Sequence, residues 1–315
     1  MGRTDVSHIP EFLAEQLGAI DPSSLERIGH GEWSRAYFFT TADGRQLVVR
    51  YSATEEDFRK DLYAQRWSSS TLPMPRLLQL GQTSDGEFYA ISERATGEFI
   101  EERDAAAMER LLPSLFETLD AARLADLSGT RGYGVWQADG HAPHATWRDM
   151  LLGVVNGPPS ARISGWRESL ARADDAQRAF EAGYAVLQTL VDACPDTRHL
   201  VHSDLLNFNA LATGDRISAV FDWGSALYGD FLWDLGWFTF WQPWYTAWAS
   251  VDIRGAARAH YGAIGLHVPN FEERLRCCEL AIGLDGLAYQ AWANKSSDNL
   301  AWTTARVRQL LQTAP

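Results

Sequence analysis

Lysine is nearly absent from this chain, because only Lys60 and Lys295 are lysines among its 28 basic residues. Cysteine is also scarce: one cysteine stands alone at Cys194, and Cys277 and Cys278 are adjacent. This spacing suits neither a disulfide framework nor a zinc site. We therefore expect the three cysteines to be small core residues.

Long apolar runs are missing as well. No uncharged stretch reaches the about 18 residues that a membrane-spanning helix needs, and the N-terminal segment lacks the basic and apolar regions of a secretory signal. The net charge of −13 disfavours binding to nucleic acid or to an anionic membrane and favours a cationic partner. We expect a cytoplasmic monomer with no membrane or nucleic-acid partner.

What is present is typical of an ordered globular protein. The 315 residues are 46% hydrophobic and include thirteen tryptophans, which is enough for two lobes with their own cores. The first hundred residues read mainly as strands, with helical spacing only near the start and in one later segment. The expected strand runs are 24–51, 76–82 and 87–95, with hairpin turns at Asp43-Gly44 and Asp85-Gly86, and the expected helices are 10–20 and 55–69.

The remainder of the chain has helical spacing, including the long run 166–192, and it is interrupted by a short β-rich stretch at 199–222. This organisation predicts an α+β, protein-kinase-like bilobal fold. An N-terminal antiparallel sheet lobe (1–96) would be joined near Gly97 to a larger, mainly helical lobe (97–315). A cleft between two such lobes is a common place for a ligand.

The strongest functional signal is a polar cluster in the otherwise apolar stretch 199–230. His202, Asp204 and Asn209 form the pattern H-x-D-x-x-x-x-N, and Asp222 follows at the end of a strand-like run. Buried polar groups of this kind usually have a partner, which can be a metal or a substrate. A zinc or hydrolase site fits poorly because no second histidine cluster supplies ligands.

The spacing within this cluster suits phosphoryl transfer. Gly214-Asp215 predicts a hairpin turn that would bring Asn209 and Asp222 to neighbouring strand ends, within reach of one Mg²⁺. Phosphoryl transfer needs such an arrangement: a hard cation held by oxygen ligands, and a carboxylate aligned on the acceptor hydroxyl. A buried hydrogen-bonded network without turnover is the alternative.

Two segments carry a family resemblance. "LVHSDLLNFNAL" and "ISAVFDWGSALYGDFLWDL" resemble the catalytic and metal-binding segments of the aminoglycoside phosphotransferase family, and stretches such as "GHGEWSRAY", "TWRDM" and "IGLDGLAYQ" spread the resemblance over almost the whole chain. It implies a kinase that uses ATP (or GTP) and Mg²⁺. Asp204 would be the catalytic carboxylate, Asn209 and Asp222 the metal ligands, and His202 a brace for the loop. The implied acceptor is a cationic aminoglycoside, hygromycin B first, and the implied outcome is antibiotic resistance.

The nucleotide is expected along the first lobe. Gly29 and Gly31 would let the backbone approach phosphates and Ser34 could donate a hydrogen bond, although an ordinary hairpin turn fits the same residues. The backbone from Glu93 to Ala95 would meet the nucleotide base.

One residue departs from the kinase pattern. Arg50 stands on the strand where kinases place a lysine, and it could hold phosphate in two hydrogen bonds or simply lie on the surface. Asp61, or less favourably Asp57, is the expected acid on the following helix. This replacement keeps a non-catalytic, nucleotide-binding pseudokinase open as a rival reading.

The acceptor site should combine carboxylates with aromatic walls. Asp285 and Tyr289 are the first candidates, and a solvated helix face or packed core aromatics are the alternative. Weaker candidates are Asp298 and the tryptophans at 237, 241 and 244. An acceptor of the macrolide, choline or homoserine type remains possible for the same fold.

A second acidic pair follows the motif closely. Asp230 and Asp234 are expected to hold the catalytic loop by hydrogen bonds. The short distance from Asp222 leaves no room for a long activation loop, and Ser203 stands where protein kinases have the Arg of His-Arg-Asp, so both features disfavour a regulated protein kinase.

Overall fold

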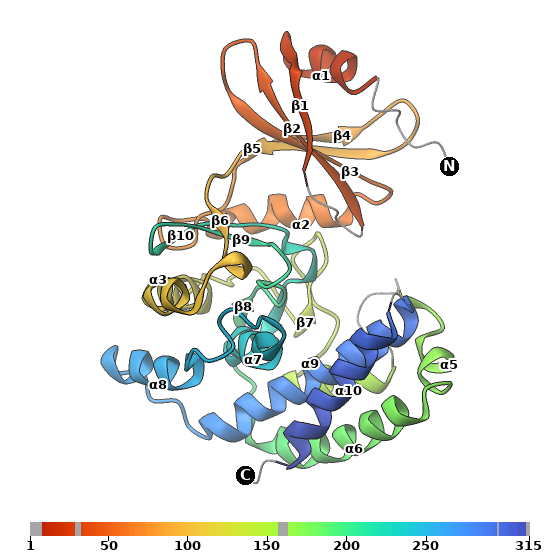
Figure 1. Cartoon of the computed structure of the whole chain (residues 1–315), viewed down its shortest axis with the longest axis vertical. Helices are drawn as coiled ribbons and strands as arrows, with labels where there is room; N and C mark the ends of the chain where they lie inside the picture. Colours follow the sequence, from red (N-terminus) through yellow and green to blue (C-terminus); the bar gives the residue numbers. More distant parts are fainter. Residues whose placement is uncertain (1–7, 29–32, 157–162, 295, 313–315) are drawn as a thin grey trace.

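The computed structural model describes residues 8–28, 33–156, 163–294 and 296–312. It has two lobes, with an antiparallel sheet above a larger helical part (Figure 1). The predicted fold class is confirmed. Among the described residues, no helix has the length and apolar character required to cross a membrane.

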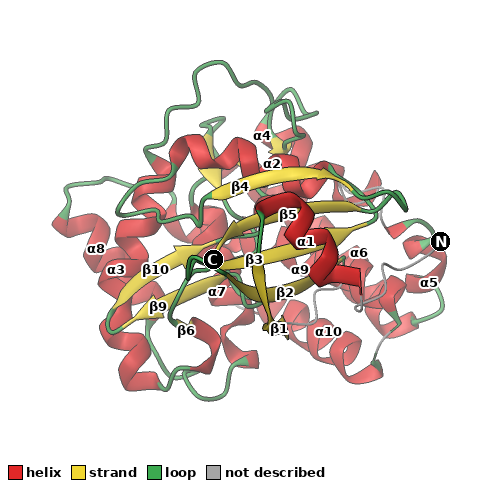
Figure 2. Ribbon diagram, turned by 90° about the horizontal axis from the view of Figure 1, so that it is seen from above, coloured by secondary structure: helices red, strands yellow, loops and turns green. Residues whose placement is uncertain are grey.

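The small lobe is a five-stranded antiparallel sheet with the order β1-β2-β3-β5-β4. Helix α1 lies over its outer face (Figure 2) and contributes Ile9 and Leu13 to a core of its own with Phe39, Val49 and Ile91. The elements are α1 (Ile9–Leu17), β1 (Ile20–Ile28), β2 (Ser34–Thr41), β3 (Gln46–Ser52), β4 (Leu77–Gln82) and β5 (Phe88–Glu93).

Local chemistry accounts for the turns in this lobe. Gly44 has φ +85° between β2 and β3, and Gly86 has φ +90° between β4 and β5. Both glycines adopt the left-handed backbone that side chains disfavour, so the two predicted turns are confirmed. Gly18, which ends α1, also has a positive φ of +83°, with ψ −164°.

Helix α2 (Glu56–Ala64) lies between the sheet and the helical lobe (Figure 1). Ala64, at its end, and Trp67 and Leu72, which follow it, are buried in the large core rather than in the small one. A backbone hydrogen bond also joins the segment after α2 to the large lobe, because the Val220 amide donates to the Pro73 carbonyl at 2.8 Å. This helix is therefore a mechanical link between the two lobes.

The large lobe is built around α9, which packs against α5, α6, α7 and α10. Two small sheets, β10-β9-β6 and β7-β11-β8, lie between these helices and the sheet lobe (Figure 1). The helices are α3 (Ala105–Arg123), α4 (Trp147–Leu152), α5 (Trp166–Leu170), α6 (Asp174–Leu190), α7 (Leu232–Trp241), α8 (Ile253–Ala263), α9 (Phe271–Ala293) and α10 (Ser297–Gln312), and the strands are β6 (Glu98–Phe99), β7 (Gly134–Val135), β8 (His199–Val201), β9 (Ala210–Thr213), β10 (Arg216–Val220) and β11 (Leu227–Gly229).

One helix differs from its predicted extent. The run 166–192 is two helices, α5 and α6, separated at residues 171–173. Asp174 and Asp175 occupy the first turn of α6, where carboxylates favour a helix start because they meet the positive end of its dipole. The cysteines behave as expected, since Cys277 and Cys278 are fully buried and Cys194 is partly buried.

Candidate active site

A hairpin brings the two predicted metal ligands together. Strands β9 and β10 pair antiparallel, with Thr213 opposite Arg216 across the Gly214-Asp215 turn and Ala210 opposite Val220. Just beyond the pairing, the Phe221 amide donates to the Asn209 carbonyl at 3.0 Å. Asn209 and Asp222 therefore leave adjacent strand ends, as the turn predicted.

Asp204 lies against this strand end in a tightly bonded loop. The Asn209 side-chain amide donates to the Asp204 carbonyl at 2.8 Å and to its carboxylate Oδ2 at 3.2 Å, and the Asn207 amide donates to Oδ1. Three residues of the loop have positive φ: Ser203 (+67°), Asn207 (+140°) and Phe208 (+62°). Non-glycine residues hold such strained conformations only where surrounding contacts impose them, and such positions cluster at functional sites.

The His202 ring is one of those contacts. It is 2% exposed, its Nδ1 accepts from the Asp204 amide at 3.3 Å, and its Nε2 lies 3.0 Å from the Phe221 carbonyl. Burial lowers its pKa to about 4, so the ring is neutral at pH 7, with Nε2 donating and Nδ1 accepting. The histidine thus joins the backbone of the Asp204 loop to the backbone before Asp222.

Two buried carboxylates hold this loop, one at residues 202–203 and one at residues 207–208. Asp234 accepts the backbone amides of His202 and Ser203 at 2.9 and 2.8 Å, as predicted. Glu101 Oε1 accepts the amides of Asn207 and Phe208 at 2.8 and 2.6 Å.

Sequence reasoning missed Glu101. It lies about a hundred positions from the loop, in the turn after the lobe connection, and no local pattern distinguishes it from its neighbours. Asp230 behaves differently from the prediction: its carboxylate forms a buried two-hydrogen-bond pair with Arg274 of α9, at 2.8 and 2.9 Å. It therefore anchors the start of α7 to α9, and its side-chain hydrogen bonds among the described residues go to Arg274 and the Leu232 amide, not to the catalytic loop.

Burial and like charge perturb the two central carboxylates. Burial raises the pKa of Asp204 well above its ordinary 3.8, with a further contribution from Asp222. Burial and the nearby Asp61 raise the pKa of Asp222 to about 6, although Arg50 opposes the shift. Acids whose ionised form is this unfavourable are well placed to accept a proton or to bind a cation.

The donor set suits a hard divalent cation shared with phosphates. The side-chain nitrogen of Asn209 donates to Asp204, which leaves the side-chain oxygen of Asn209 as a ligand. Asp222, whose backbone has φ +64°, supplies a carboxylate. Among the described residues, no group of three or more His, Cys, Asp or Glu side chains could hold a metal alone. Mg²⁺ is commonly bound through one or two protein oxygens plus substrate phosphates, and these two residues fit that pattern.

Arg50 reaches this site from the sheet lobe. Its guanidinium pairs with Asp61 of α2, the acid that was expected, and Asp61 also accepts the Trp223 amide at 2.7 Å. Burial acts to lower the pKa of Arg50, but the charges of Asp61 and Asp222 outweigh it and raise that pKa. One carboxylate therefore connects the strand cation to the backbone directly after Asp222, and Arg50 is not a free surface residue.

The structure places only some of the remaining residues that were predicted for the nucleotide site. Ser34 begins β2 opposite Ser52, while Gly29 and Gly31 lie outside the described residues. The Glu93 amide donates to the Arg76 carbonyl at 2.9 Å. Because that donor is occupied, Glu93 cannot offer its amide to a base.

The nucleotide contact expected along the backbone from Glu93 to Ala95 stays a prediction. Ala95 is only partly buried. Just beyond it, the Thr96 carbonyl accepts from Ser218 at 2.8 Å, which fixes the connection against the β9–β10 hairpin.

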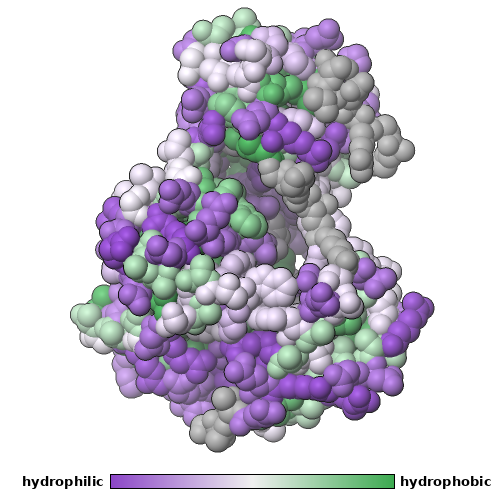
Figure 3. Space-filling view, viewed as in Figure 1, coloured by the Kyte–Doolittle hydropathy of each residue, from purple (hydrophilic) through white to green (hydrophobic). Residues whose placement is uncertain are grey.

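The predicted acceptor residues form a stripe on α9. Asp285, Tyr289 and Trp292 recur at helical spacing on one partly exposed face, and the indole of Trp292 stacks on that of Trp33, with ring centroids 6.0 Å apart. Trp33 lies just before β2, so this contact links the stripe on α9 to the sheet lobe. The molecule is narrower between the two lobes, as Figure 3 shows. Burial raises the pKa of Asp285 to about 6, and no described side chain pairs with it.

The weaker acceptor candidates lie in different environments. Trp241 stacks on Trp302 of α10, with centroids 5.4 Å apart, and would contact a Cβ added at Gly286, next to Asp285. Asp298 is exposed at the start of α10.

Tyr245, which was not predicted, lies close enough to Glu101 and Asp204 for both charges to raise its pKa, after burial as the main cause. It is therefore a further neighbour of the catalytic loop.

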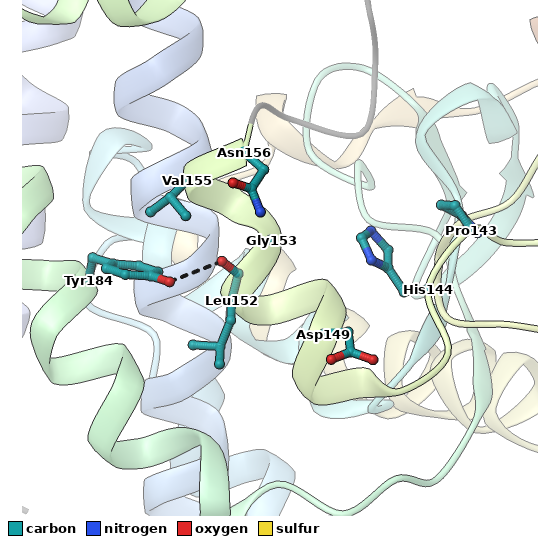
Figure 4. Close-up of a pocket in the computed structure, with 8 residues that line it drawn as sticks. All are labelled: Pro143, His144, Asp149, Leu152, Gly153, Val155, Asn156 and Tyr184. Carbon is teal, nitrogen blue, oxygen red and sulfur yellow. Dashed lines mark hydrogen bonds between the residues drawn. The ribbon is translucent and has the colours of Figure 1, made fainter.

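A separate pocket of about 720 Å³ opens elsewhere on the large lobe (Figure 4). His144 and Asp149 point into it, and the Tyr184 hydroxyl donates to the Leu152 carbonyl at 3.2 Å on its far side. None of the predicted site residues lines it. The candidate site is therefore the loop and hairpin around Asp204, not this pocket.

Comparison with known proteins agrees with this geometry. A model of the phosphotransferase enzyme family matches residues 24–271. Hygromycin-B 4-O-kinase of Escherichia coli is 33% identical over 300 residues, which cover 95% of this chain and 83% of that protein. A thermostable mutant of aminoglycoside phosphotransferase APH(4)-Ia, in a ternary complex with AMP-PNP and hygromycin B, is 30% identical with a TM-score of 0.82, over 97% of this chain and 98% of that one.

A more distant structure shares the fold alone. Macrolide 2'-phosphotransferase MphH from Brachybacterium faecium is 19% identical with a TM-score of 0.60, over 96% of this chain and 98% of that one. The predicted resemblance to aminoglycoside phosphotransferases is confirmed by the closer matches. The family model, the 33% identical relative and the loop around Asp204 all lead to one conclusion: this chain belongs to the phosphotransferase enzyme family.

Proposed function

We propose that this protein transfers the γ-phosphoryl group of ATP to a hydroxyl of a cationic aminoglycoside, with hygromycin B as the first acceptor to test. The observation that carries the proposal is the position of Asp204, whose carboxylate is bonded to the Asn209 amide at the strand end that leads to Asp222. One relative named above is a hygromycin-B kinase, and another was solved in a complex with hygromycin B, which supports this choice of acceptor.

In the proposed reaction, the acceptor hydroxyl oxygen forms a bond to the γ-phosphorus while the bond from that phosphorus to the β,γ-bridging oxygen breaks. ADP leaves with the electron pair of the broken bond, and the hydroxyl proton passes to Asp204 Oδ. The raised pKa of Asp204 suits this role because its carboxylate accepts a proton more readily than an exposed aspartate does. Positioning of the two reactants supplies most of the acceleration in such a loose transition state.

Asn209 and Asp222 would hold Mg²⁺, which when bound supplies positive charge to the phosphate oxygens. Arg50, held by Asp61, would add a charge that cannot be lost by deprotonation near neutral pH. Asp204, by contrast, accepts hydrogen bonds from two side-chain amides, and in the proposed reaction it orients the acceptor hydroxyl. The residues thus divide into a phosphate-holding set and a hydroxyl-orienting carboxylate.

The α9 stripe is the proposed acceptor surface. Asp285 is a partly buried carboxylate with no cationic partner among the described side chains, so an ammonium group of the acceptor would lower its free energy on binding. Tyr289 and Trp292 follow on the same face and offer aromatic walls of the kind that suit cationic sugars. Trp33 extends this wall into the lobe that would carry the nucleotide.

The rival readings make different predictions in one experiment. Purified protein with Mg-ATP is incubated with hygromycin B, other aminoglycosides, a macrolide, choline or homoserine, and ADP release and product mass are followed. A gain of one phosphate on hygromycin B supports the proposal. Transfer only to another compound would support the kinase activity but contradict the proposed acceptor. Tight Mg-nucleotide binding with no transfer to any compound would support the pseudokinase, which the Arg50 replacement motivates.

We further propose that the protein acts as a monomer in the cytoplasm. One chain supplies every residue of the proposed site from its two lobes, and the proposed phosphoryl donor is an intracellular nucleotide.

A further inference from the structure

A lysine is buried beside the candidate metal site without being part of it. Lys60 of α2 is 2% exposed, its Nζ donates to the Gly224 carbonyl at 2.5 Å and to the Ala226 carbonyl at 3.5 Å, and it lies 4.7 Å from the ring centroid of Trp136. Both carbonyls belong to the segment directly after Asp222. Helix α2, which carries Lys60, lies between the two lobes (Figure 1).

Packing alone does not account for this residue. Taking an ammonium group out of water is expensive, and an apolar side chain of the same length would fill the space without that penalty. Hydrogen bonds from a charged donor to carbonyls, together with the indole face, recover part of the cost. The chain also uses arginine at nearly every other basic position, and a guanidinium is larger and planar where this site takes a compact, three-donor ammonium.

The neighbouring residue completes the arrangement. Asp61 accepts the Trp223 amide at 2.7 Å. Two consecutive side chains of α2 therefore bind one backbone segment, because Asp61 takes an amide of it and Lys60 takes two of its carbonyls. Gly224 packs closely there, since a Cβ added to it would meet the Asp57 carboxylate at 3.0 Å. The segment that follows Asp222 is therefore held by α2 at several backbone atoms.

We propose that Lys60 is a positioning residue that fixes the backbone after Asp222, so that affinity for a divalent metal and nucleotide depends on a side chain that touches neither. The inference rests on the proposed role of Asp222 as a metal ligand. Outer contacts that orient ligands commonly change metal affinity or activity by about 10–100-fold when removed.

The test measures metal binding directly. Mn²⁺ is titrated into the protein with a non-hydrolysable ATP analogue, and free Mn²⁺ is followed by electron paramagnetic resonance for the parent and for Lys60→Met. Methionine keeps the length and removes the charge and donors. The control is Arg59→Met, which removes an exposed cation of the same helix that forms an ion pair with Glu55. We expect Mn²⁺ affinity to fall at least about tenfold in Lys60→Met, to be partly retained in Lys60→Arg, and to be unchanged in the control.

Unchanged Mn²⁺ affinity in folded Lys60→Met would overturn the inference and leave Lys60 as a packing residue. If Lys60→Met does not fold, as judged by circular dichroism, Lys60→Gln is titrated and judged by the same two outcomes. The proposed function fails separately, because it is tested by acceptor phosphorylation, and this titration needs no acceptor. If the parent itself binds no Mn²⁺ with nucleotide, the premise about Asp222 is wrong and the inference falls with it.

Discussion

Replacing Asp222 with asparagine should stabilise the protein in the absence of metal while removing its activity. The side chain keeps its shape, so the change mainly removes a carboxylate charge from a site where burial and Asp61 disfavour it. The attraction of Arg50 for that charge is lost too, but the pKa of about 6 already includes that attraction. The net effect of the native environment is therefore unfavourable to the ionised form.

The size of the effect follows from the pKa. The difference between about 6 in the folded protein and 3.8 for an ordinary aspartate corresponds to roughly 3 kcal/mol, since each pKa unit is worth about 1.4 kcal/mol. The folded state holds the proton more tightly than the unfolded state, so this group favours folding below pH 3.8. That contribution is lost as pH rises from 3.8 through about 6. Asp222→Asn should thus gain about 3 kcal/mol at pH 8 and about 1 kcal/mol at pH 4.5 relative to the parent.

Chemical denaturation with a chelator present, at both pH values, measures this difference. A saturating Mg-nucleotide complex should then stabilise the parent, by about 2.7 kcal/mol at a hundredfold excess over Kd, and should stabilise Asp222→Asn much less. The reasoning is refuted if metal-free Asp222→Asn is less stable than the parent at pH 8, or if its stability gain does not shrink on acidification.

Three further variants probe separate parts of the site. Asp204→Asn should lower kcat by about a thousandfold with nucleotide affinity retained, and transfer at the parental rate would contradict the catalytic role. Asp285→Asn should raise the KM for a cationic acceptor by at least about tenfold with little change in the KM for ATP, whereas the exposed-acid control Asp298→Asn should change neither. Glu101→Ala, which removes the acceptor of the Asn207 and Phe208 backbone amides, should lower kcat by roughly a hundredfold. Glu101→Gln should retain most activity because its side chain keeps an acceptor oxygen. Equal losses of kcat in the two variants would argue against anchoring of the loop by Glu101.

Local patterns account for the parts of the site that were predicted. Gly214-Asp215 defines the hairpin, and the hairpin alone brings Asn209 beside the residue before Asp222. Asp61, rather than Asp57, pairs with Arg50, and both were candidates because they lie one helical turn apart on α2. In each case the relevant neighbours are a few positions away or are linked by a regular element.

Long-range packing decided what was not predicted. Glu101 holds the catalytic loop from about a hundred residues away, and Lys60 contacts carbonyls more than 160 positions along the chain. The helix predicted over 166–192 is broken, and Asp230 pairs with Arg274 instead of holding the loop. The Trp33–Trp292 contact joins the two lobes, and no periodicity in either segment indicates it.

The sequence by itself determined the family, the two-lobe plan and the catalytic motif, because turn residues, hydrophobic periodicity and short spacings act within one segment of chain. Only the tertiary structure decided which buried charges face one another. Those pairings depend on how α2, α7 and α9 pack against the hairpin, and burial then raises the pKa values of Asp204, Asp222 and Asp285. Charges are costly away from water and must be compensated by whatever lies nearby, and what lies nearby is set by the complete fold.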